Sequence, residues 1–307
     1  MTGLSYLPPE QDFLEAGRVG ADCPDAARAI VIPYGLEASV SYGQGTAAGP
    51  AAILAASEQL ELFDEELWCE PYRDYGVATL TPQAIPATVP EALNELARIT
   101  DTVLLQDKFP LILGGEHALT AGALRPFIER FSDLVVLHID AHADLRDGYQ
   151  GEHYSHAAAM RRVLDYPSVS IVSVGIRAIS QEEADFYEAN RNRITIWWAK
   201  DQAAWDINRI VAALANRPIY VTFDIDGLDA AQMPATGTPT PGGLCYWQAL
   251  SLLRKAAQTG RIVGGDVVEL APIKGFHAYD YTAAAIAYKI MSYALSGAGR
   301  SQEYSER

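Results

Sequence analysis

Residues 134–144, with the sequence LVVLHIDAHAD, decide the fold of this chain. Six mostly apolar residues are followed at once by Asp140, His142 and Asp144. A short segment rich in Val, Ile and Leu is typical of a strand that is buried on both faces of a parallel sheet. Ligands bind beyond the carboxyl ends of such strands, so polar residues that directly follow a strand mark a candidate site.

The rest of the chain repeats this alternation. Similar segments predict strands at 29–33, 110–113, 169–174, 194–198, 218–225 and 261–270, with a weaker one at 75–78. Helical periodicity covers 50–66, 90–105, 118–131, 181–190, 206–215, 247–259 and 278–295. Strands that alternate with helices predict a single-domain, three-layer α/β/α fold with a doubly wound, mostly parallel sheet of about eight strands. We expect residues 1–27 to be an N-terminal arm and residues 28–307 to be the catalytic domain.

Composition narrows the class of protein. The 307 residues include 23 Lys and Arg against 39 Asp and Glu, a net charge of −16. Non-specific nucleic-acid affinity comes from Lys and Arg, so this charge argues against a nucleic-acid partner, and it suits a small cationic substrate. Three scattered cysteines, no signal peptide and no apolar run of about 18–20 residues predict a cytoplasmic protein with no membrane partner.

Two further strand ends carry polar residues. His117 follows the strand at 110–113 within Gly-Gly-Glu-His, Asp224 lies at the end of the strand at 218–225, and Asp226 follows that strand directly. A single Asp or His at a strand end is most often an ordinary hydrogen-bonded group, and the Gly pair alone is most often a turn. Three such ends together indicate a metal site, because a group of buried carboxylates without cations would be costly. No G-x-G-x-x-G or P-loop pattern supports a nucleotide site.

The spacing bears on the number of metal ions. If the segment were extended, Asp140 and Asp144 would lie roughly 13 Å apart, beyond the reach of one ion. Either the chain curls after the strand, or the cluster holds two ions about 3.5–4 Å apart. The ligands are mainly carboxylates, which favours Mn²⁺, and the imidazoles leave Ni²⁺, Co²⁺ and Zn²⁺ open.

At these residues the chain resembles the ureohydrolase family, which includes arginases and agmatinases. GGEHALT, DAHADL, SHA, DIDGLD, ATGTP and VVELAP occur in the family's order between residues 30 and 295, and SYGQGTAAGPAAIL is similar to the agmatinase branch. The resemblance implies an arginase-like fold and a homo-oligomer, either a trimer or a hexamer. It also implies a binuclear manganese centre, in which Asp140 and Asp224 bridge two ions and the remaining ligands are His117, His142, Asp144 and Asp226.

The resemblance further implies the catalytic chemistry. A hydroxide that bridges the metals would attack the guanidinium carbon and release urea and an amine. Glu269 would hold the guanidinium, and Asp144 would accept a proton. His156 would shuttle a proton to the leaving amine, with His153 as the alternative. Among the neighbouring residues, we expect Glu116 to orient a metal ligand and His138 to be a buried structural histidine.

The substrate is less defined. The loop at 145–153 and the turn at 175–180 lack the groups with which arginases bind an amino acid, which favours agmatine, cleaved to putrescine and urea for polyamine biosynthesis. We expect Asp147 and Glu152 to bind the distal amine of this cationic substrate. Arg146 in the same loop leaves guanidinobutyrate open, and free guanidine is a further alternative. A non-catalytic, metal-binding homologue is the remaining hypothesis, and a urea assay would separate it from the enzymes.

Overall fold

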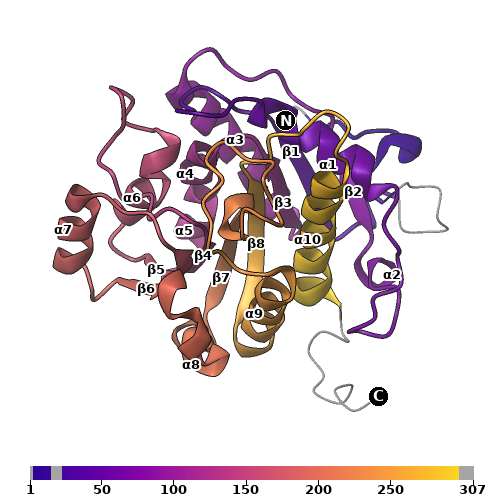
Figure 1. The fold of residues 1–307 in the computed structure, drawn as a ribbon. Helices are drawn as coiled ribbons and strands as arrows, with labels where there is room; N and C mark the ends of the chain where they lie inside the picture. The colour runs from indigo at the N-terminus through magenta and orange to yellow at the C-terminus, as the bar shows by residue number, and fades with distance from the viewer. Residues whose placement is uncertain (1–2, 15–22, 297–307) are drawn as a thin grey trace.

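Eight strands form a sheet in the computed structural model, which describes residues 3–14 and 23–296 (Figure 1). All seven neighbouring strand pairs are parallel. The spatial order is β2-β1-β3-β8-β7-β4-β5-β6, and the strands are β1 (Ala29–Tyr34), β2 (Val77–Thr79), β3 (Phe109–Gly114), β4 (Val135–Ile139), β5 (Ser170–Ile176), β6 (Ile194–Trp198), β7 (Pro218–Asp224) and β8 (Arg261–Val268). The predicted parallel sheet is confirmed.

Helices cover both faces of the sheet, which gives the three layers (Figure 1). One apolar layer includes α1 (Gly49–Ser57), α2 (Tyr72–Tyr75), α8 (Ile207–Val211), α9 (Tyr246–Thr259) and α10 (Ala278–Leu295). The other includes α3 (Val89–Leu104), α4 (Thr120–Ala123), α5 (Arg125–Arg130), α6 (Ala159–Leu164) and α7 (Gln181–Ala189). Within β4, Val135 and Leu137 belong to the first layer and Val136 to the second, so the strand is buried on both faces.

Local sequence explains where several helices begin. Asp206 caps α8 as an N-cap residue, since its carboxylate accepts the Asn208 N–H at 2.9 Å. Ser180 and Glu183 form a capping box at the start of α7, in which each side chain accepts the other residue's backbone N–H. This box also places Glu183 at the edge of the cavity described below.

Two helix predictions are wrong in extent. The helix expected over 50–66 ends at Ser57, where the N–H groups of Gln59 and Leu60 bind carbonyls three residues back and close turns. Further along, Asp64 accepts the N–H groups of Glu66 and Leu67, both at 2.9 Å, in a separate turn. The helix expected over 118–131 is broken into a 3₁₀ turn, α4 and α5. Pro126 lies in the first turn of α5, and it has no N–H with which to continue a helix from α4. No helix is predicted from the sequence pattern at α2 or α6.

The described part of the expected N-terminal arm packs against the sheet layer. Phe13 and Leu14 are buried in the same apolar cluster as α1 and α10, and Tyr6 bridges to Leu80 beyond β2. Positions 15–22 of the arm, and 297–307 of the expected catalytic domain, lie outside the described residues. Over 3–14 and 23–296, no helix is both long enough and apolar enough to cross a membrane.

Candidate functional site

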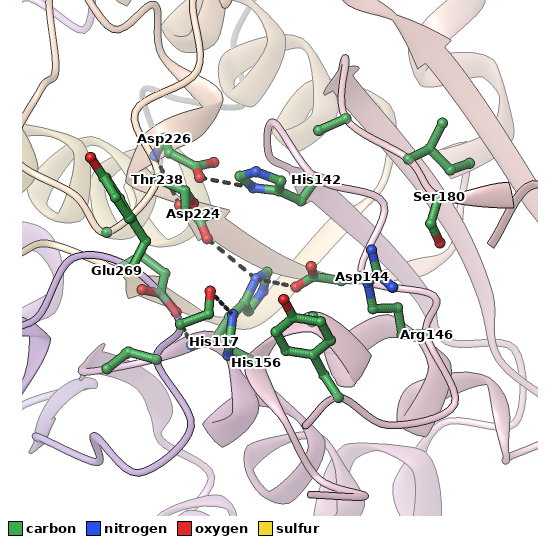
Figure 2. Close-up of a pocket in the computed structure, with 18 of the residues that line it drawn as sticks. His117, His142, Asp144, Arg146, His156, Ser180, Asp224, Asp226, Thr238 and Glu269 are labelled. Atoms are coloured by element: carbon green, nitrogen blue, oxygen red, sulfur yellow. Dashed lines mark hydrogen bonds and ion pairs between the residues drawn. The ribbon is translucent and has the colours of Figure 1, made fainter. Parts of the chain in front are cut away.

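A cavity of about 470 Å³ lies beyond the carboxyl ends of the central strands (Figure 2). His117 follows β3, Asp144 follows β4, Asp224 ends β7 and Glu269 follows β8. These four strands are consecutive in the sheet, so residues more than 150 positions apart in the sequence line one cavity. The parallel fold therefore brings together the strand-end residues that the sequence singled out.

His117 faces three carboxylates. Its Nδ1 atom lies 3.1 Å from Asp140 Oδ2, 3.0 Å from Asp144 Oδ2 and 3.4 Å from Asp224 Oδ2. The side chain is buried, and this nitrogen has no hydrogen bond of acceptable geometry. The other ring nitrogen, Nε2, lies 2.8 Å from the hydroxyl of Thr222. One unpaired imidazole nitrogen aimed at three carboxylate oxygens is a donor set that fits a divalent metal ion.

A second group overlaps the first. His142 Nδ1 lies 3.0 Å from Asp226 Oδ2 and 3.6 Å from Asp140 Oδ1. Ligand atoms lie within 4.8 Å of one another in two groups, His117, His138, Asp140 and Asp144 in the first and Asp140, His142 and Asp226 in the second, so Asp140 belongs to both. His138 is fully buried as predicted, with its Nε2 2.8 Å from Asp140 Oδ2 and its Nδ1 3.0 Å from Ser173 Oγ. The described chain thus contains two His/Asp groups that can bind metal and that share one carboxylate, and all of their members except the partly exposed His142 are buried.

The chain curls between Asp140 and Asp144. Both carboxylates lie near 3 Å from the same nitrogen of His117, so the extended separation of Asp140 and Asp144 does not occur. Asp144 adopts a left-handed backbone conformation with φ of 54°, and the next N–H, that of Leu145, is held by Glu183 at 3.0 Å. Glu269 is also left-handed, with φ of 65°. Such strained positions cluster at functional sites.

The contacts between the carboxylates and histidines of the site shift the pKa values of both. Burial opposes ionisation of Asp140, but contacts with three histidines outweigh it and hold its pKa well below the usual value. Burial and the neighbouring carboxylates raise the pKa of Asp224 and Asp226. Burial disfavours the charged form of His142, yet Asp226 and Asp140 outweigh it and raise its pKa to about 12. This group of carboxylates is stabilised by positive charge, which is what divalent ions would bring.

Glu269 and His156 both line the cavity (Figure 2). Oε1 of Glu269 accepts the backbone N–H of His117 at 2.6 Å, so the carboxylate is fixed beside the His/Asp groups. Burial raises the pKa of Glu269 to about 8, and a cationic partner would lower it again. His153 is not among the lining residues, and its ring packs against Tyr154 and contacts Arg162.

Asp147 and Glu152, expected to bind the distal amine, do not line the cavity. The Asp147 side chain is 58% exposed and pairs with Arg162 Nη2 at 2.6 Å. Glu152 accepts the N–H of Tyr154 at 2.9 Å. Arg146, from the same loop, does line the cavity. The structure therefore brings one charged residue of this loop to the site and leaves two outside it.

Several lining residues were not predicted from the sequence. Glu183 could have been found from the capping pattern Ser180-x-x-Glu183. Ser41 and Tyr42 lie in SYGQGTAAGPAAIL, and Thr238 lies in ATGTP, two stretches that carry the resemblance but to which no role was given. Val40 and Ile179 lie in loops without a recognisable motif. Glu116 differs from expectation, since the described hydrogen bonds of its carboxylate lead to the backbone and side chain of residues 38–39 and not to a metal ligand.

Comparison with known proteins agrees with this geometry. The model of the arginase family matches residues 27–295. N(1)-aminopropylagmatine ureohydrolase from Synechocystis is 38% identical over 93% of this chain and 94% of its own length, and agmatinase from Bacillus subtilis is 32% identical over 82% and 87%. The crystal structure of agmatine ureohydrolase from Thermoplasma volcanium superposes with a TM-score of 0.79 at 27% identity, covering 90% of each chain. The chain belongs to the arginase family and is a ureohydrolase-type enzyme, a metal-dependent hydrolase of guanidino C–N bonds.

Proposed function

We propose that this chain hydrolyses the guanidino group of an agmatine-type cation and releases urea and an amine. One observation carries the proposal: Glu269 stands in the same cavity as two overlapping His/Asp groups that can bind metal. A guanidinium ion is planar and cationic, so a carboxylate can bind it through two parallel hydrogen bonds. Recognition of the guanidinium and the means to hydrolyse it therefore lie side by side.

The donor set supports two Mn²⁺ ions. Asp140 belongs to both groups and would bridge the ions, and we assign the same role to Asp224. The other ligands would be His117, His142, Asp144 and Asp226. Carboxylate-rich sites suit Mn²⁺, while Ni²⁺, Co²⁺ and Zn²⁺ are the alternatives for the metal analysis. Divalent ions held here would lower the pKa of a water molecule and so supply a nucleophile at neutral pH.

Three residues of the chain would bind the substrate and transfer protons. Glu269 holds the guanidinium so that its carbon faces the His/Asp groups. Asp144 lies at the centre of the site, 3.0 Å from His117, and can accept a proton from the attacking water. His156 lines the same cavity and can give a proton to the leaving amine, since imidazole exchanges protons near neutral pH.

Charge in the cavity favours a cationic substrate. Apart from the proposed metal ligands, two carboxylates, Glu183 and Glu269, and two guanidinium groups line it, and protein groups engage both guanidinium groups. Arg177 donates to backbone carbonyls that include those of Asp226 and Thr240. Arg146 lies over the Tyr149 ring, with its Nε 3.9 Å from Glu183. This arrangement supports agmatine over guanidinobutyrate.

N(1)-aminopropylagmatine is the second candidate. It carries the same guanidino group on a longer polyamine, and the Synechocystis relative named for it matches nearly the whole chain. The lining of the cavity includes Tyr42, a residue that is 83% exposed and can offer an aromatic face to an additional amine. Both candidates keep the same reaction and differ only in the part of the substrate outside the Glu269 pocket.

The test is urea release by Mn²⁺-loaded protein from agmatine, N(1)-aminopropylagmatine, guanidinobutyrate, arginine and guanidine. We expect the two polyamine substrates to have the highest kcat/KM, and we expect chelation of metal to abolish release until Mn²⁺ is restored. A preference for guanidinobutyrate would change the assigned substrate but leave the proposed reaction unchanged. Failure to release urea from any of them, with Mn²⁺, Ni²⁺, Co²⁺ or Zn²⁺, would leave only a metal-binding role.

The Glu269→Gln variant tests guanidinium recognition. Gln retains an oxygen for the His117 N–H but loses the charge, so kcat/KM should fall about 10- to 100-fold, the value of one charge-assisted hydrogen bond. Metal content should be unchanged by elemental analysis. An unchanged kcat/KM would contradict the role given to Glu269.

We also propose that the protein is cytoplasmic and acts in polyamine biosynthesis, and that it assembles as a trimer or a hexamer. Cys23, Cys69 and Cys245 are all free thiols, which suits a reducing compartment. Light scattering on the purified protein would measure the assembly, and a monomer would contradict it.

A further inference from the structure

At both ends of the loop at residues 37–47, backbone N–H groups donate hydrogen bonds to a glutamate carboxylate. Oε2 of Glu116, which is fully buried, accepts the N–H groups of Ala38 at 2.7 Å and Ser39 at 2.6 Å. At the other end, Glu37 accepts the N–H groups of Gly45 and Ala47. The tip of the loop, residues 40–43, lines the cavity. The loop is therefore held in place before any substrate arrives.

Glu116 also fixes the direction of the Ser39 hydroxyl. Ser39 Oγ lies 2.9 Å from Glu116 Oε1. An ionised carboxylate can only accept, so the single hydrogen of this hydroxyl points to Glu116. Its oxygen then has only lone pairs for its other neighbours. One of these is the backbone N–H of His156, which donates to Ser39 Oγ at 2.9 Å.

The same oxygen faces the imidazole of His156. Ser39 Oγ lies 3.2 Å from Nδ1, and Ser155 Oγ lies 3.3 Å from the same nitrogen. Because Ser39 can only accept here, an unprotonated Nδ1 would set its lone pair against that of Ser39 Oγ, and this favours a hydrogen on Nδ1. Ser155, whose hydroxyl can donate or accept, can share that hydrogen. In neutral His156 the unprotonated nitrogen is then Nε2.

Nε2 is also the nitrogen on the cavity side. Its polar neighbour is Ser41 Oγ at 3.5 Å, and Ser41 lines the cavity, whereas Ser39 is not among the lining residues. Figure 2 shows His156 among the side chains that line the cavity, a set that also includes His117 and Asp144. The nitrogen with a lone pair therefore points toward the space where the substrate would react.

We propose that Ser39, oriented by Glu116, is a positioning residue that holds His156 as the Nδ1–H tautomer and directs a basic Nε2 into the cavity. The tautomer stands on geometry alone, while its use rests on the proposed function. In that use, Nε2 takes a proton from the solvent and His156 becomes an imidazolium. The oxygen of the attacking water bonds to the guanidinium carbon as Asp144 accepts one of its protons. When the C–N bond then breaks, its electron pair passes to the leaving nitrogen, which takes the proton from Nε2, the second proton of the water oxygen returns to the solvent, and neutral imidazole returns. Ser39 accepts from Nδ1–H throughout, so nothing needs to reorient.

The first readout is the tautomer itself, measured by NMR on protein with ¹⁵N-labelled histidine. The chain has six histidines, and the His156→Asn variant identifies the signals of His156. We expect a protonated Nδ1 in the wild type and a loss of this preference in Ser39→Ala. Glu116→Gln should go further: the oxygen of Gln must face the two N–H groups, so its NH₂ donates to Ser39 and turns the hydroxyl toward Nδ1, which favours Nε2–H. A wild-type His156 protonated on Nε2, or a tautomer that neither variant changes, would overturn the proposal.

The second readout is kinetic. In Ser39→Ala, kcat should fall about 10-fold or more, a modest share of what general acid–base catalysis contributes. KM and metal content should stay within about twofold, because the Glu116 bonds to the loop backbone remain. Ser39→Thr, which keeps the hydroxyl, should restore most of kcat, and Ser132→Ala, at an exposed serine, is the matched control.

Two failures can be told apart. If the tautomer responds to Ser39 and Glu116 as expected but no substrate yields urea, the positioning holds and the proposed function fails. If urea is released and kcat is the same in Ser39→Ala as in the wild type, the proposed function holds and the role of Ser39 in it is wrong.

Discussion

Two walls of the cavity are built by different means. The strand wall consists of the residues at the ends of β3, β4, β7 and β8, from His117 to Glu269, and most of its side chains are buried. The loop wall is formed by the loops at 37–47 and 145–153, of which residues 40–43, Arg146 and Tyr149 line the cavity, and it includes the 83% exposed Tyr42. Sheet hydrogen bonds fix the first wall, whereas side chains from distant segments, such as Glu116 and Arg162, fix the second. A strand end is thus positioned by the fold, while a loop is positioned by its particular partners.

The strongest test of the strand wall is Asp224→Ala. Asp224 faces His117 at the centre of the site, and we propose that it serves both metal ions. Its loss should remove metal and lower kcat by about 1,000-fold or more, since metal catalysis is worth several kcal/mol. Elemental analysis and urea release measure both effects. Asp133→Ala, at an exposed aspartate, is the control, and full metal content with near-normal turnover in Asp224→Ala would break the bridging assignment.

An intermediate effect on stability and metal affinity is expected from a substitution at Thr222, whose hydroxyl contacts His117 of the strand wall. The Thr222 hydroxyl lies 2.8 Å from His117 Nε2 and donates to Asp266 Oδ1 at 2.6 Å, and Asp266, in β8, is fully buried. Thr222→Val keeps the shape but leaves two buried polar atoms unpaired, which should cost about 1–3 kcal/mol in the free energy of unfolding. Removal of a group that orients a metal-binding histidine should also weaken metal binding about 10- to 100-fold.

Denaturant unfolding and metal titration measure these two quantities for Thr222→Val. Thr222→Ser keeps the hydroxyl and should stay close to the wild type in metal affinity. Equal metal affinity in Thr222→Val and Thr222→Ser would show that the strand wall does not depend on this hydrogen bond, and it would remove one of the differences between the walls.

The contrast between the walls also explains what the sequence could predict. His117, Asp140 and Asp224 follow apolar segments whose period and composition identify buried parallel strands, and the fold brings such ends together. The partners of a loop residue have no such pattern. Ser39 meets Glu116 across 77 positions, and nothing in the sequence near either residue indicates the contact. For the same reason the helix expected beyond Ser57 was wrong: the chain forms turns there, and Asp64 binds backbone N–H groups and Lys289.

The smallest effect is expected in the loop wall, at Asp147. Its carboxylate is exposed and pairs with Arg162, and the hydrogen bond from Arg162 lowers its pKa. Arg162 also has Asp165 within 3.1 Å, so Asp147→Asn should change the free energy of unfolding by about 1 kcal/mol or less. We expect kcat/KM for agmatine to stay within about twofold, as in the parallel variant Glu152→Gln.

One outcome of the Asp147→Asn experiment would change the description of the loop wall. The sequence predicts that Asp147 binds the distal amine, and guanidine has no such amine. If Asp147→Asn raised KM for agmatine about 10-fold and left guanidine unchanged, the carboxylate would have to leave Arg162 and turn into the cavity when substrate binds. The loop wall would then be a moving part that selects the substrate, set against a strand wall that stays fixed. Equal, small effects on both substrates would mean that Arg162 and Asp147 only hold the loop in place.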